Sequence, residues 1–89
     1  MISREIEIRN KLGLHARAAA KLVHAAARFK SDIKVRKGSD QVDAKSILGI
    51  LLLAAGQGTK ITVTASGEDE TEAVESIESL IDSKFDESE

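Results

Sequence analysis

Residues 11–23, KLGLHARAAAKLV, decide how this chain folds because they carry it into its first helix. Alanine is the strongest helix former, so the alanine-rich run after residue 15 predicts a helix. His15 stands where that helix begins, although Ser, Thr, Asp and Asn are the usual residues at a helix start. Departures from a local rule occur most often at functional sites, so His15 is the first candidate.

The regions on either side of this stretch have different periodicities. Upstream, Ile6 and Ile8 alternate with charged residues, as a strand buried on one face requires. Downstream, the apolar residues from Ala16 to Arg28 recur at helical spacing, which predicts a helix packed on one side. His24 lies off that apolar stripe, and we expect it to be solvated.

The middle of the chain predicts a β-hairpin and a short helix. In KGSD, at 37–40, Gly38 and Ser39 offer a two-residue turn between segments of alternating polarity. The apolar run at 47–55 follows. We expect it to form a short helix that ends at Gly56, because glycine adopts a positive φ without steric cost.

The last third of the chain predicts one more strand and one more helix. Residues 61–66 alternate between apolar and polar side chains. Beyond Gly67, Asp69 is placed to cap a helix, with Glu72 as its reciprocal partner in a capping box. The apolar stripe of that helix consists of Ala73, Val74, Ile77, Leu80 and Ile81.

The predicted order of elements is β-α-β-β-α-β-α. Each strand offers one apolar face, so the helices must collect on one side of the sheet while the other side meets water. The expected fold class is α/β (α+β): an open-faced β-sandwich with a four-stranded antiparallel sheet and three helices on one face. We expect residues 1–85 to form a single domain and residues 86–89 to form an acidic, frayed tail.

The composition narrows the function classes. The absence of cysteine excludes disulfides and thiolate metal sites, and the charged, alternating N-terminus is unlike a signal peptide. The longest apolar run, 47–55, is shorter than the roughly 20 residues that span a bilayer. We therefore expect a cytoplasmic protein without membrane insertion. The only aromatic residues are Phe29 and Phe85, so the strands have no aromatic surface for bases and we expect no nucleic-acid partner.

Charge is distributed unevenly along the chain. Residues 1–67 contain 12 of the 13 basic and 5 of the 15 acidic residues, a net charge of +7, whereas residues 68–89 have a net charge of −9. Such polarity steers encounters with charged partners. A solvated helix and tail account for the acidic end, while the positive charges of the first part would suit an anion.

His15 and Arg17 together form a candidate anion site. A helix start leaves the N–H groups of Ala16, Arg17 and Ala18 without helical partners and carries about half a positive charge. The Arg17 guanidinium suits phosphate oxygens, and positive surroundings favour a neutral imidazole whose lone pair attacks phosphorus. His15 is therefore a candidate phosphoryl acceptor. The alternative is that His15 is an incidental surface histidine and Arg17 a solvated charge.

Two segments, GLHARAAAKLVHAAARFKSDI at 13–33 and AKSILGILLLAAGQGTKITVTASGEDE at 44–70, resemble the HPr family of histidine-containing phosphocarriers of the bacterial phosphotransferase system. The resemblance covers nearly the whole chain and implies the same open-faced sandwich. It implies that Nδ1 of His15 carries the phosphoryl group, as pros-phosphohistidine, and that Arg17 stabilises it. It also implies a relay protein rather than an enzyme, with phosphorylated enzyme I as donor and enzyme IIA components of a sugar or nitrogen-related system as acceptors.

The chain departs from the family pattern after Arg17. The family usually has Pro and then Ala-Thr where this chain has Ala18, Ala19 and Ala20. A proline in the first helical turn loses no helix hydrogen bond, so Ala18 should leave the fold intact and restore one N–H near the phosphoryl site. We expect an altered phosphohistidine lifetime or altered partner rates, and a nitrogen-regulatory paralogue stays open.

Ser46 and the helix behind it form the second candidate site. By residue type Ser46 is a good helix cap, which is the structural alternative to any regulatory role. The resemblance implies phosphorylation of Ser46 by an HPr kinase/phosphorylase, which adds about −1.5 to −2 charge and would affect docking rather than folding. The helix is too apolar to bury all its side chains, and the resemblance implies that Ile47, Leu48 and Leu51 contact enzyme I and enzyme IIA.

A competing interpretation is an HPr-like regulatory module that binds its partners through the Ser46 face without relaying phosphate. Its natural signature is a replaced histidine, whereas His15 is present. The two histidines lie nine residues apart without a matching carboxylate pattern, which makes them a weak metal-ligand set. We therefore expect no metal site. We also expect no cofactor and a monomeric protein.

Overall fold

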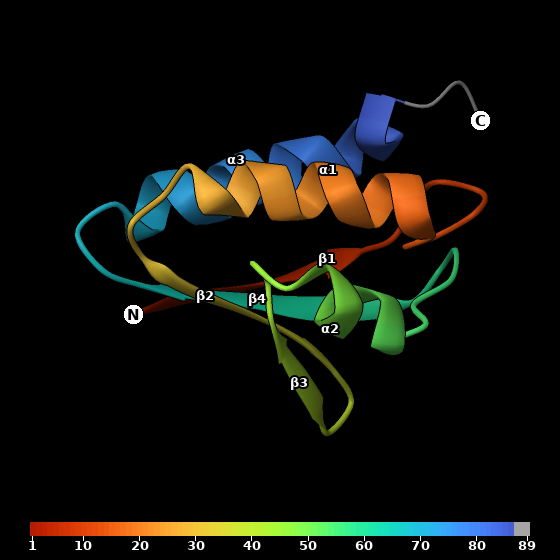
Figure 1. The fold of residues 1–89 in the computed structure, drawn as a ribbon, viewed down its shortest axis with the longest axis horizontal. Helices are drawn as coiled ribbons and strands as arrows, with labels where there is room; N and C mark the ends of the chain where they lie inside the picture. Colours follow the sequence, from red (N-terminus) through yellow and green to blue (C-terminus); the bar gives the residue numbers. More distant parts are fainter. Residues whose placement is uncertain (87–89) are drawn as a thin grey trace.

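A computed structural model describes residues 1–86 of the chain (Figure 1). Its elements are β1 (Ile2–Glu7), α1 (Ala16–Ala27), β2 (Asp32–Lys37), β3 (Asp40–Asp43), α2 (Ile47–Leu52), β4 (Lys60–Ser66), α3 (Glu70–Asp82) and a short 3-10 turn, η1 (Lys84–Asp86). The predicted order β-α-β-β-α-β-α is confirmed, and η1 is an addition that the sequence did not predict.

The four strands form one antiparallel sheet in the order β1-β4-β2-β3. Val63 in the middle of β4 lies opposite Arg4 of β1 on one side and opposite Val35 of β2 on the other. The predicted hairpin turn joins β2 to β3, and Gly38 adopts a φ of +61° there. The first strand of the chain thus depends on the last one for its pairing.

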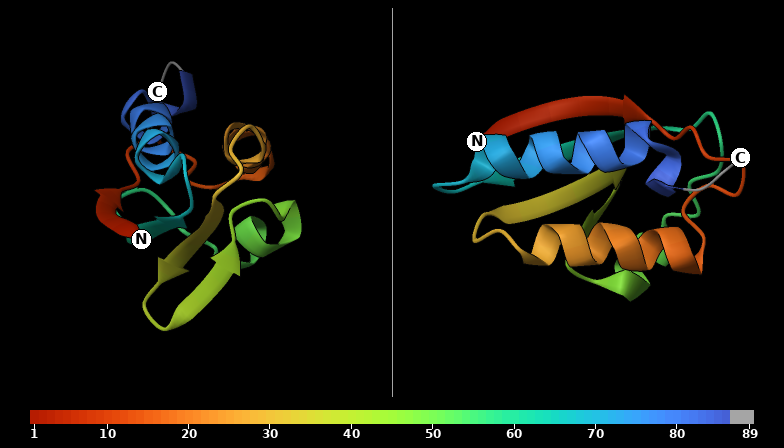
Figure 2. Two further views of the ribbon diagram at one scale, coloured as in Figure 1. Left: turned by 90° about the vertical axis from the view of Figure 1, so that its left-hand side faces the viewer. Right: turned by 90° about the horizontal axis from the view of Figure 1, so that it is seen from above.

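The helices lie on one side of the sheet, as predicted. Figure 1 shows α1 and α3 side by side across one face, and Figure 2 shows α2 next to α1, above the β3 end of the sheet. In β4 the buried side chains alternate with more exposed ones, which is the pattern of a sheet covered on one face. The core consists mainly of aliphatic side chains, among them Ile33, Val35, Ile61, Val63, Leu22, Val74, Ile77 and Ile81, all at most 1% exposed.

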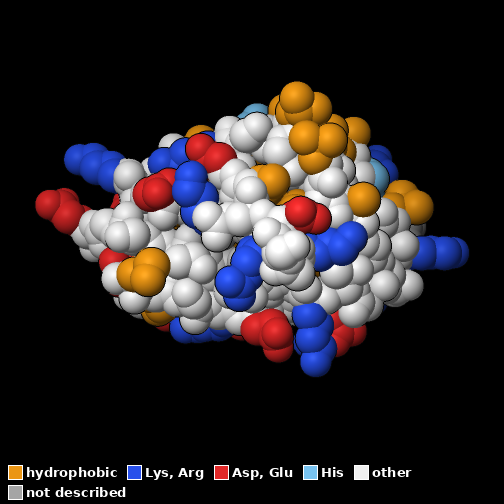
Figure 3. Space-filling view, turned by 90° about the horizontal axis from the view of Figure 1, so that it is seen from below, with side chains coloured by type: hydrophobic (Ala, Val, Ile, Leu, Met, Phe, Trp, Pro, Cys, Tyr) orange, Lys and Arg blue, Asp and Glu red, His pale blue; other side chains and the backbone are white. Residues whose placement is uncertain are grey.

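The other face of the sheet carries polar and charged side chains. Lys34, Arg36, Thr62 and Thr64 alternate with the core residues and therefore point away from the helices. Figure 3, seen from this side, shows cationic and anionic side chains interspersed. None of the helices within residues 1–86 has the length and apolar character that a membrane crossing requires.

The helix α2 is shorter than predicted. It ends at Leu52, with Leu53 as its C-cap, so the predicted end at Gly56 is wrong. The residue that adopts a left-handed conformation is Ala54, with a φ of +51°. Lys37 Nζ donates to the Leu53 carbonyl at 3.0 Å, and this lysine of the neighbouring hairpin supplies a partner for one of the terminal carbonyls. Such a tertiary partner has no local sequence signal.

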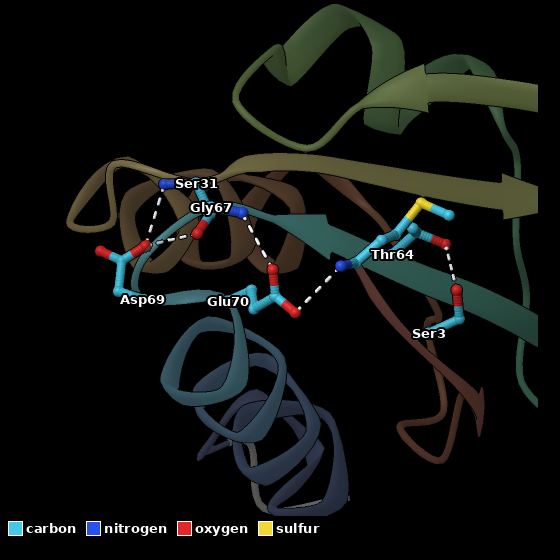
Figure 4. Close-up of polar contacts among 7 residues, drawn as sticks. Ser3, Ser31, Thr64, Gly67, Asp69 and Glu70 are labelled. Atoms are coloured by element: carbon cyan, nitrogen blue, oxygen red, sulfur yellow. Dashed lines mark hydrogen bonds and ion pairs between the residues drawn. The ribbon is translucent and has the colours of Figure 1, made fainter.

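The predicted capping box of α3 is also wrong. Asp69 is the N-cap of α3, but its side chain makes no capping hydrogen bond. Its carboxylate instead accepts hydrogen bonds from the backbone N–H groups of Lys30 and Ser31, both at 2.9 Å, and from the Ser31 hydroxyl at 2.5 Å. These contacts, led by the Ser31 hydroxyl, hold the pKa of Asp69 below its ordinary value. Figure 4 shows how Asp69 thereby joins α3 to the loop before β2.

The neighbouring residue Glu70, rather than Glu72, reaches back across the start of α3. Its Oε1 accepts a hydrogen bond from the Gly67 backbone N–H at 3.1 Å, and its Oε2 lies 3.1 Å from the N-terminal amino group (Figure 4). The Gly67 bond first, and then the amino group, lower the pKa of Glu70. The two carboxylates at this helix start therefore bind other segments of the chain.

The turn η1 closes the end of the core. Lys84, Phe85 and Asp86 all have positive φ angles, 58°, 57° and 60°, which make a left-handed turn. The side chain of Phe85 is fully buried, and Lys21 Nζ donates to its carbonyl oxygen at 2.5 Å. Of the tail predicted for residues 86–89, Asp86 belongs to this turn, and residues 87–89 lie outside the described residues.

Candidate functional site

His15 is the N-cap of α1, as the sequence predicted. Its backbone is extended, with φ −74° and ψ 179°, and its carbonyl accepts the first helical hydrogen bond from the Ala19 N–H at 2.8 Å. Its ring Nδ1 accepts a hydrogen bond from the Arg17 backbone N–H at 3.3 Å. A ring nitrogen therefore occupies the place that the side-chain oxygen of Ser or Asp usually takes.

The hydrogen bond to Nδ1 fixes which ring nitrogen carries the lone pair. An amide N–H only donates, so Nδ1 is the acceptor and the proton of a neutral ring resides on Nε2. The lone pair that a phosphoryl group would use lies on Nδ1, at the positive end of the helix dipole. The His15 side chain is partly exposed. The ring thus lies at the surface and is not part of the buried core.

The loop before His15 is held by close backbone contacts. Gly13 has a φ of +67°, and a Cβ at this position would lie 2.5 Å from the Ala55 carbonyl oxygen. The next residue, Leu14, donates its N–H to that same oxygen at 2.9 Å. The buried side chain of Asn10 donates from Nδ2 to the Gly13 carbonyl at 2.7 Å. Glycine is required here because both the positive φ and the close approach exclude a side chain.

The other residues predicted at this site surround the same helix start. Arg17 and Ala16 are exposed in the first turn of α1, whereas the Ala18 side chain is fully buried. The N–H groups of Ala16, Arg17 and Ala18 precede the first i→i−4 bond, which Ala19 makes. One of these three, that of Arg17, points at Nδ1. The three N–H groups therefore lie at the helix start beside His15, and their binding of a phosphoryl group stays a prediction.

Ser46 caps α2 in the conventional way. Its backbone is extended, with φ −111° and ψ 111°, and its Oγ accepts a hydrogen bond from the Gly49 N–H at 3.1 Å. The preceding residue, Lys45, donates from Nζ to the Phe29 carbonyl at 2.9 Å, which ties the start of α2 to the end of α1. The capping role expected for Ser46 is confirmed by this geometry.

The helix α2 carries an exposed apolar surface. Ile47, Leu48 and Leu51, the predicted docking residues, are 45%, 65% and 37% exposed, while Ile50 and Leu53 are buried in the core. Figure 3 shows hydrophobic side chains gathered toward one edge of that view.

Sequence reasoning missed two members of this exposed set, Leu52 and Leu12. Leu52 follows Leu48 by one helical turn, so helical spacing could have revealed it. Leu12 lies in the loop before His15, where periodicity gives no signal.

His24 is exposed in the middle of α1, as expected. It lies nine residues, or about two and a half helical turns, beyond His15, so the structure does not bring the two histidines into one site. Within residues 1–86, no group of three or more His, Cys, Asp or Glu side chains is arranged to hold a metal ion.

Comparisons with known proteins agree with this geometry. The family model described as PTS HPr component phosphorylation site matches residues 2–83, which include His15, Arg17 and Ser46. A phosphocarrier protein HPr of Cupriavidus necator is 48% identical over 89 residues, with all of both chains covered. A phosphocarrier protein NPr of Shewanella violacea is 44% identical over 86 residues, covering 97% of this chain and 94% of that protein.

A solved structure gives the same result for the fold. The crystal structure of HPr-C-His from Thermoanaerobacter tengcongensis matches with a TM-score of 0.97 and 47% sequence identity, over the whole of both chains. The family model and the similarity to HPr proteins over the full length establish the assignment: this chain belongs to the HPr family, the phosphocarriers of the phosphotransferase system.

Proposed function

We propose that this chain accepts a phosphoryl group on Nδ1 of His15 from phosphorylated enzyme I and passes it to enzyme IIA components of a sugar or nitrogen-related phosphotransferase system. It would act as a monomer in the cytoplasm. The observation that carries the proposal is the hydrogen bond from the Arg17 N–H to Nδ1, because it leaves the lone pair on that nitrogen at a helix start.

The transfer would proceed by in-line displacement. The lone pair of Nδ1 attacks phosphorus, the bond between phosphorus and the donor atom of enzyme I breaks, and that atom keeps the electron pair. The proton on Nε2 stays in place. The Arg17 N–H can then donate to a phosphoryl oxygen, and the exposed Arg17 side chain adds positive charge in the same helical turn. Transfer to enzyme IIA is the same step with this chain as the donor.

The test is incubation with enzyme I and phosphoenolpyruvate, followed by mass spectrometry. We expect a gain of one phosphoryl group that is labile in acid and stable in base, and that is absent from His15→Ala. A second variant, His15→Asn, keeps a good N-cap but has no nucleophilic ring. It should fold normally and stay unphosphorylated. Phosphorylation of either variant would contradict the proposal.

Ser46 is proposed as a regulatory phosphorylation site for an HPr kinase/phosphorylase. Ser46 is only partly buried at the start of α2, the helix that carries the exposed apolar residues Leu48 and Leu51. A phosphate there would add negative charge to the surface through which we propose that enzyme I and enzyme IIA dock. The kinase with ATP should give an acid-stable adduct that Ser46→Ala lacks.

The docking surface proposed for both partners consists of Ile47, Leu48 and Leu51. We expect Ser46→Asp to lower the rate of phosphoryl transfer from enzyme I without changing the fold, because acidic partner surfaces would be repelled. Leu48→Ala should raise the KM for this chain as a substrate of enzyme I, since Leu48 is 65% exposed and adds little to the core. Rates equal to wild type in both variants would contradict docking through α2.

A further inference from the structure

A polar groove runs between α1 and α3, away from the start of α1 where His15 lies. The two helices run in opposite directions, as Figure 2 shows. Arg28, just after α1, therefore lies beside Ser76 in the middle of α3, and Lys21, in the middle of α1, lies beside the turn that follows α3. The side chains that line the groove are Lys21, His24, Ala25 and Arg28 from one side, and Ser76, Ser79, Leu80, Ser83 and Asp86 from the other.

The two permanent cations of the groove are held in place at its two ends. At one end Arg28 Nη2 donates to the Ser76 hydroxyl at 3.2 Å. At the other end Lys21 Nζ donates to the Phe85 carbonyl at 2.5 Å. A guanidinium has five N–H donors and an ammonium three, so these contacts position the groups and leave donors for a ligand. His24 lies between them on the same wall and is exposed.

The facing wall is free of the carboxylates that dominate α3. This helix contains five acidic residues, and none of them is among the described residues that line the groove. Three are engaged elsewhere: Glu70 with the N-terminal amino group, Glu78 with Arg4 at 2.6 Å, and Asp82 with Arg9 at 3.3 Å. The wall therefore offers serine hydroxyls, and Asp86 is the one carboxylate of the described lining.

We propose that this groove binds a small metabolite with two anionic groups, at least one of them a phosphate. Lys21 and Arg28 lie two helical turns apart, about 10 Å along the axis, and their long side chains can reach two separate anionic groups. The hydroxyls of Ser76, at the Arg28 end, and of Ser79 supply neutral donors along the facing wall. The site is distinct from His15 and does not depend on the proposed phosphoryl relay.

The test is an NMR titration of the full chain with 3-phosphoglycerate, which has a phosphate and a carboxylate, and with inorganic phosphate. We expect 3-phosphoglycerate to shift the resonances of His24, Arg28, Ser76 and Ser79 in a saturable way, with an affinity about fivefold higher than that of phosphate. Shifts confined to His15 and its neighbours would overturn the groove proposal. They would leave the relay untouched, since the two sites are read at different residues.

Variants separate a built site from general attraction to a basic surface. Arg28→Gln should weaken 3-phosphoglycerate binding about fivefold, and Ser76→Ala about twofold by releasing the guanidinium. The matched control is Arg36→Gln, since Arg36 is exposed on the outer face of the sheet. It should leave the affinity unchanged. Equal weakening in Arg28→Gln and Arg36→Gln would overturn the proposal, and spectra with native dispersion would show that each variant is folded.

Discussion

The first and last helices both begin at a titratable residue, yet the two residues are used in opposite ways. At the start of α1, His15 accepts a hydrogen bond from its own helix and remains partly exposed. At the start of α3, Asp69 makes no capping bond and accepts three hydrogen bonds from Lys30 and Ser31 instead. The start of α1 thus has a cap within its own helix, whereas the start of α3 joins two segments of the chain and supports the fold.

The largest effect is expected at the loop that leads into α1. Gly13→Ala should lower the free energy of unfolding by about 2–4 kcal/mol, because alanine is strained at positive φ and its Cβ would collide with the Ala55 carbonyl. Gly38→Ala is the matched control, since Gly38 has a φ of +61° but a Cβ there would point into open space. It should cost about 1–2 kcal/mol. Equal losses in urea unfolding would show that the contact with Ala55 is unimportant.

The variant Asp69→Asn tests whether the carboxylate at the start of α3 stabilises the fold. The pKa of Asp69 lies below its ordinary value of 3.8, so its ionised form stabilises the folded state above that pH, and this contribution is lost as the pH falls through the folded-state pKa. Urea unfolding at pH 7 and at pH 3 should show a lower stability for the variant at pH 7 and a smaller loss on acidification.

Asp40→Asn, at an exposed carboxylate of β3, provides the control for the Asp69 prediction. It should keep the pH dependence of the wild type. Because hydrogen bonding also lowers the pKa of Glu70, some acid sensitivity should persist in Asp69→Asn. A variant with the full wild-type pH dependence would contradict the role assigned to Asp69.

The start of α2 is a third case. Like His15 in α1, Ser46 caps its own helix, but with a hydroxyl instead of an imidazole ring. Ser46→Ala removes the acceptor of the Gly49 N–H and should cost about 1 kcal/mol of unfolding free energy. Ser46→Asp retains a capping oxygen and should stay within about 0.5 kcal/mol of the wild type. If both variants lost the same stability, the cap would not be what Ser46 contributes.

The smallest effect on stability is expected at Ala54, just after α2. The next residue, Ala55, has the carbonyl that accepts a hydrogen bond from Leu14 in the loop before His15. Ala54 has a φ of +51°, which glycine adopts without strain, so Ala54→Gly should gain about 0.5 kcal/mol after the entropic cost of glycine is subtracted. Ala55→Gly serves as the control because Ala55 is buried and is not at positive φ. Ala55→Gly should be destabilising. If Ala54→Gly also lost stability, the backbone strain assigned to Ala54 would be wrong.

Local sequence patterns predicted the helices and strands, but they failed at helix ends whose hydrogen-bond partners lie far away in the sequence. The alternation in 61–66 and the spacing in 70–81 were enough to place β4 and α3, because each buries a single face. The capping box failed because Ser31, nearly forty positions away in the chain, provides better donors for Asp69 than the helix does. At the end of α2, Lys37 binds the Leu53 carbonyl, a contact between distant segments that the local sequence does not encode.

For the candidate site too, the local sequence predicted the position of the key residue but not its contacts. The position of His15 at a helix start follows from Gly13 and the alanine run, and the structure has it there. The hydrogen bond to Nδ1 is a matter of side-chain geometry, and the support of the loop by Ala55 is a tertiary contact. The turn η1 escaped prediction because three successive residues other than glycine at positive φ have no propensity signal, and the burial of Phe85 compensates for their strain.

The order β1-β4-β2-β3 also has a consequence for how the protein is made. A ribosome delivers residues 2–7 first, but the strand that they pair with is residues 60–66. Residues 2–7 therefore cannot pair until most of the polypeptide has been synthesised, and the buried Phe85 is added later still. Only the β2–β3 hairpin and isolated helical turns can form earlier, so we expect folding to follow, rather than accompany, translation.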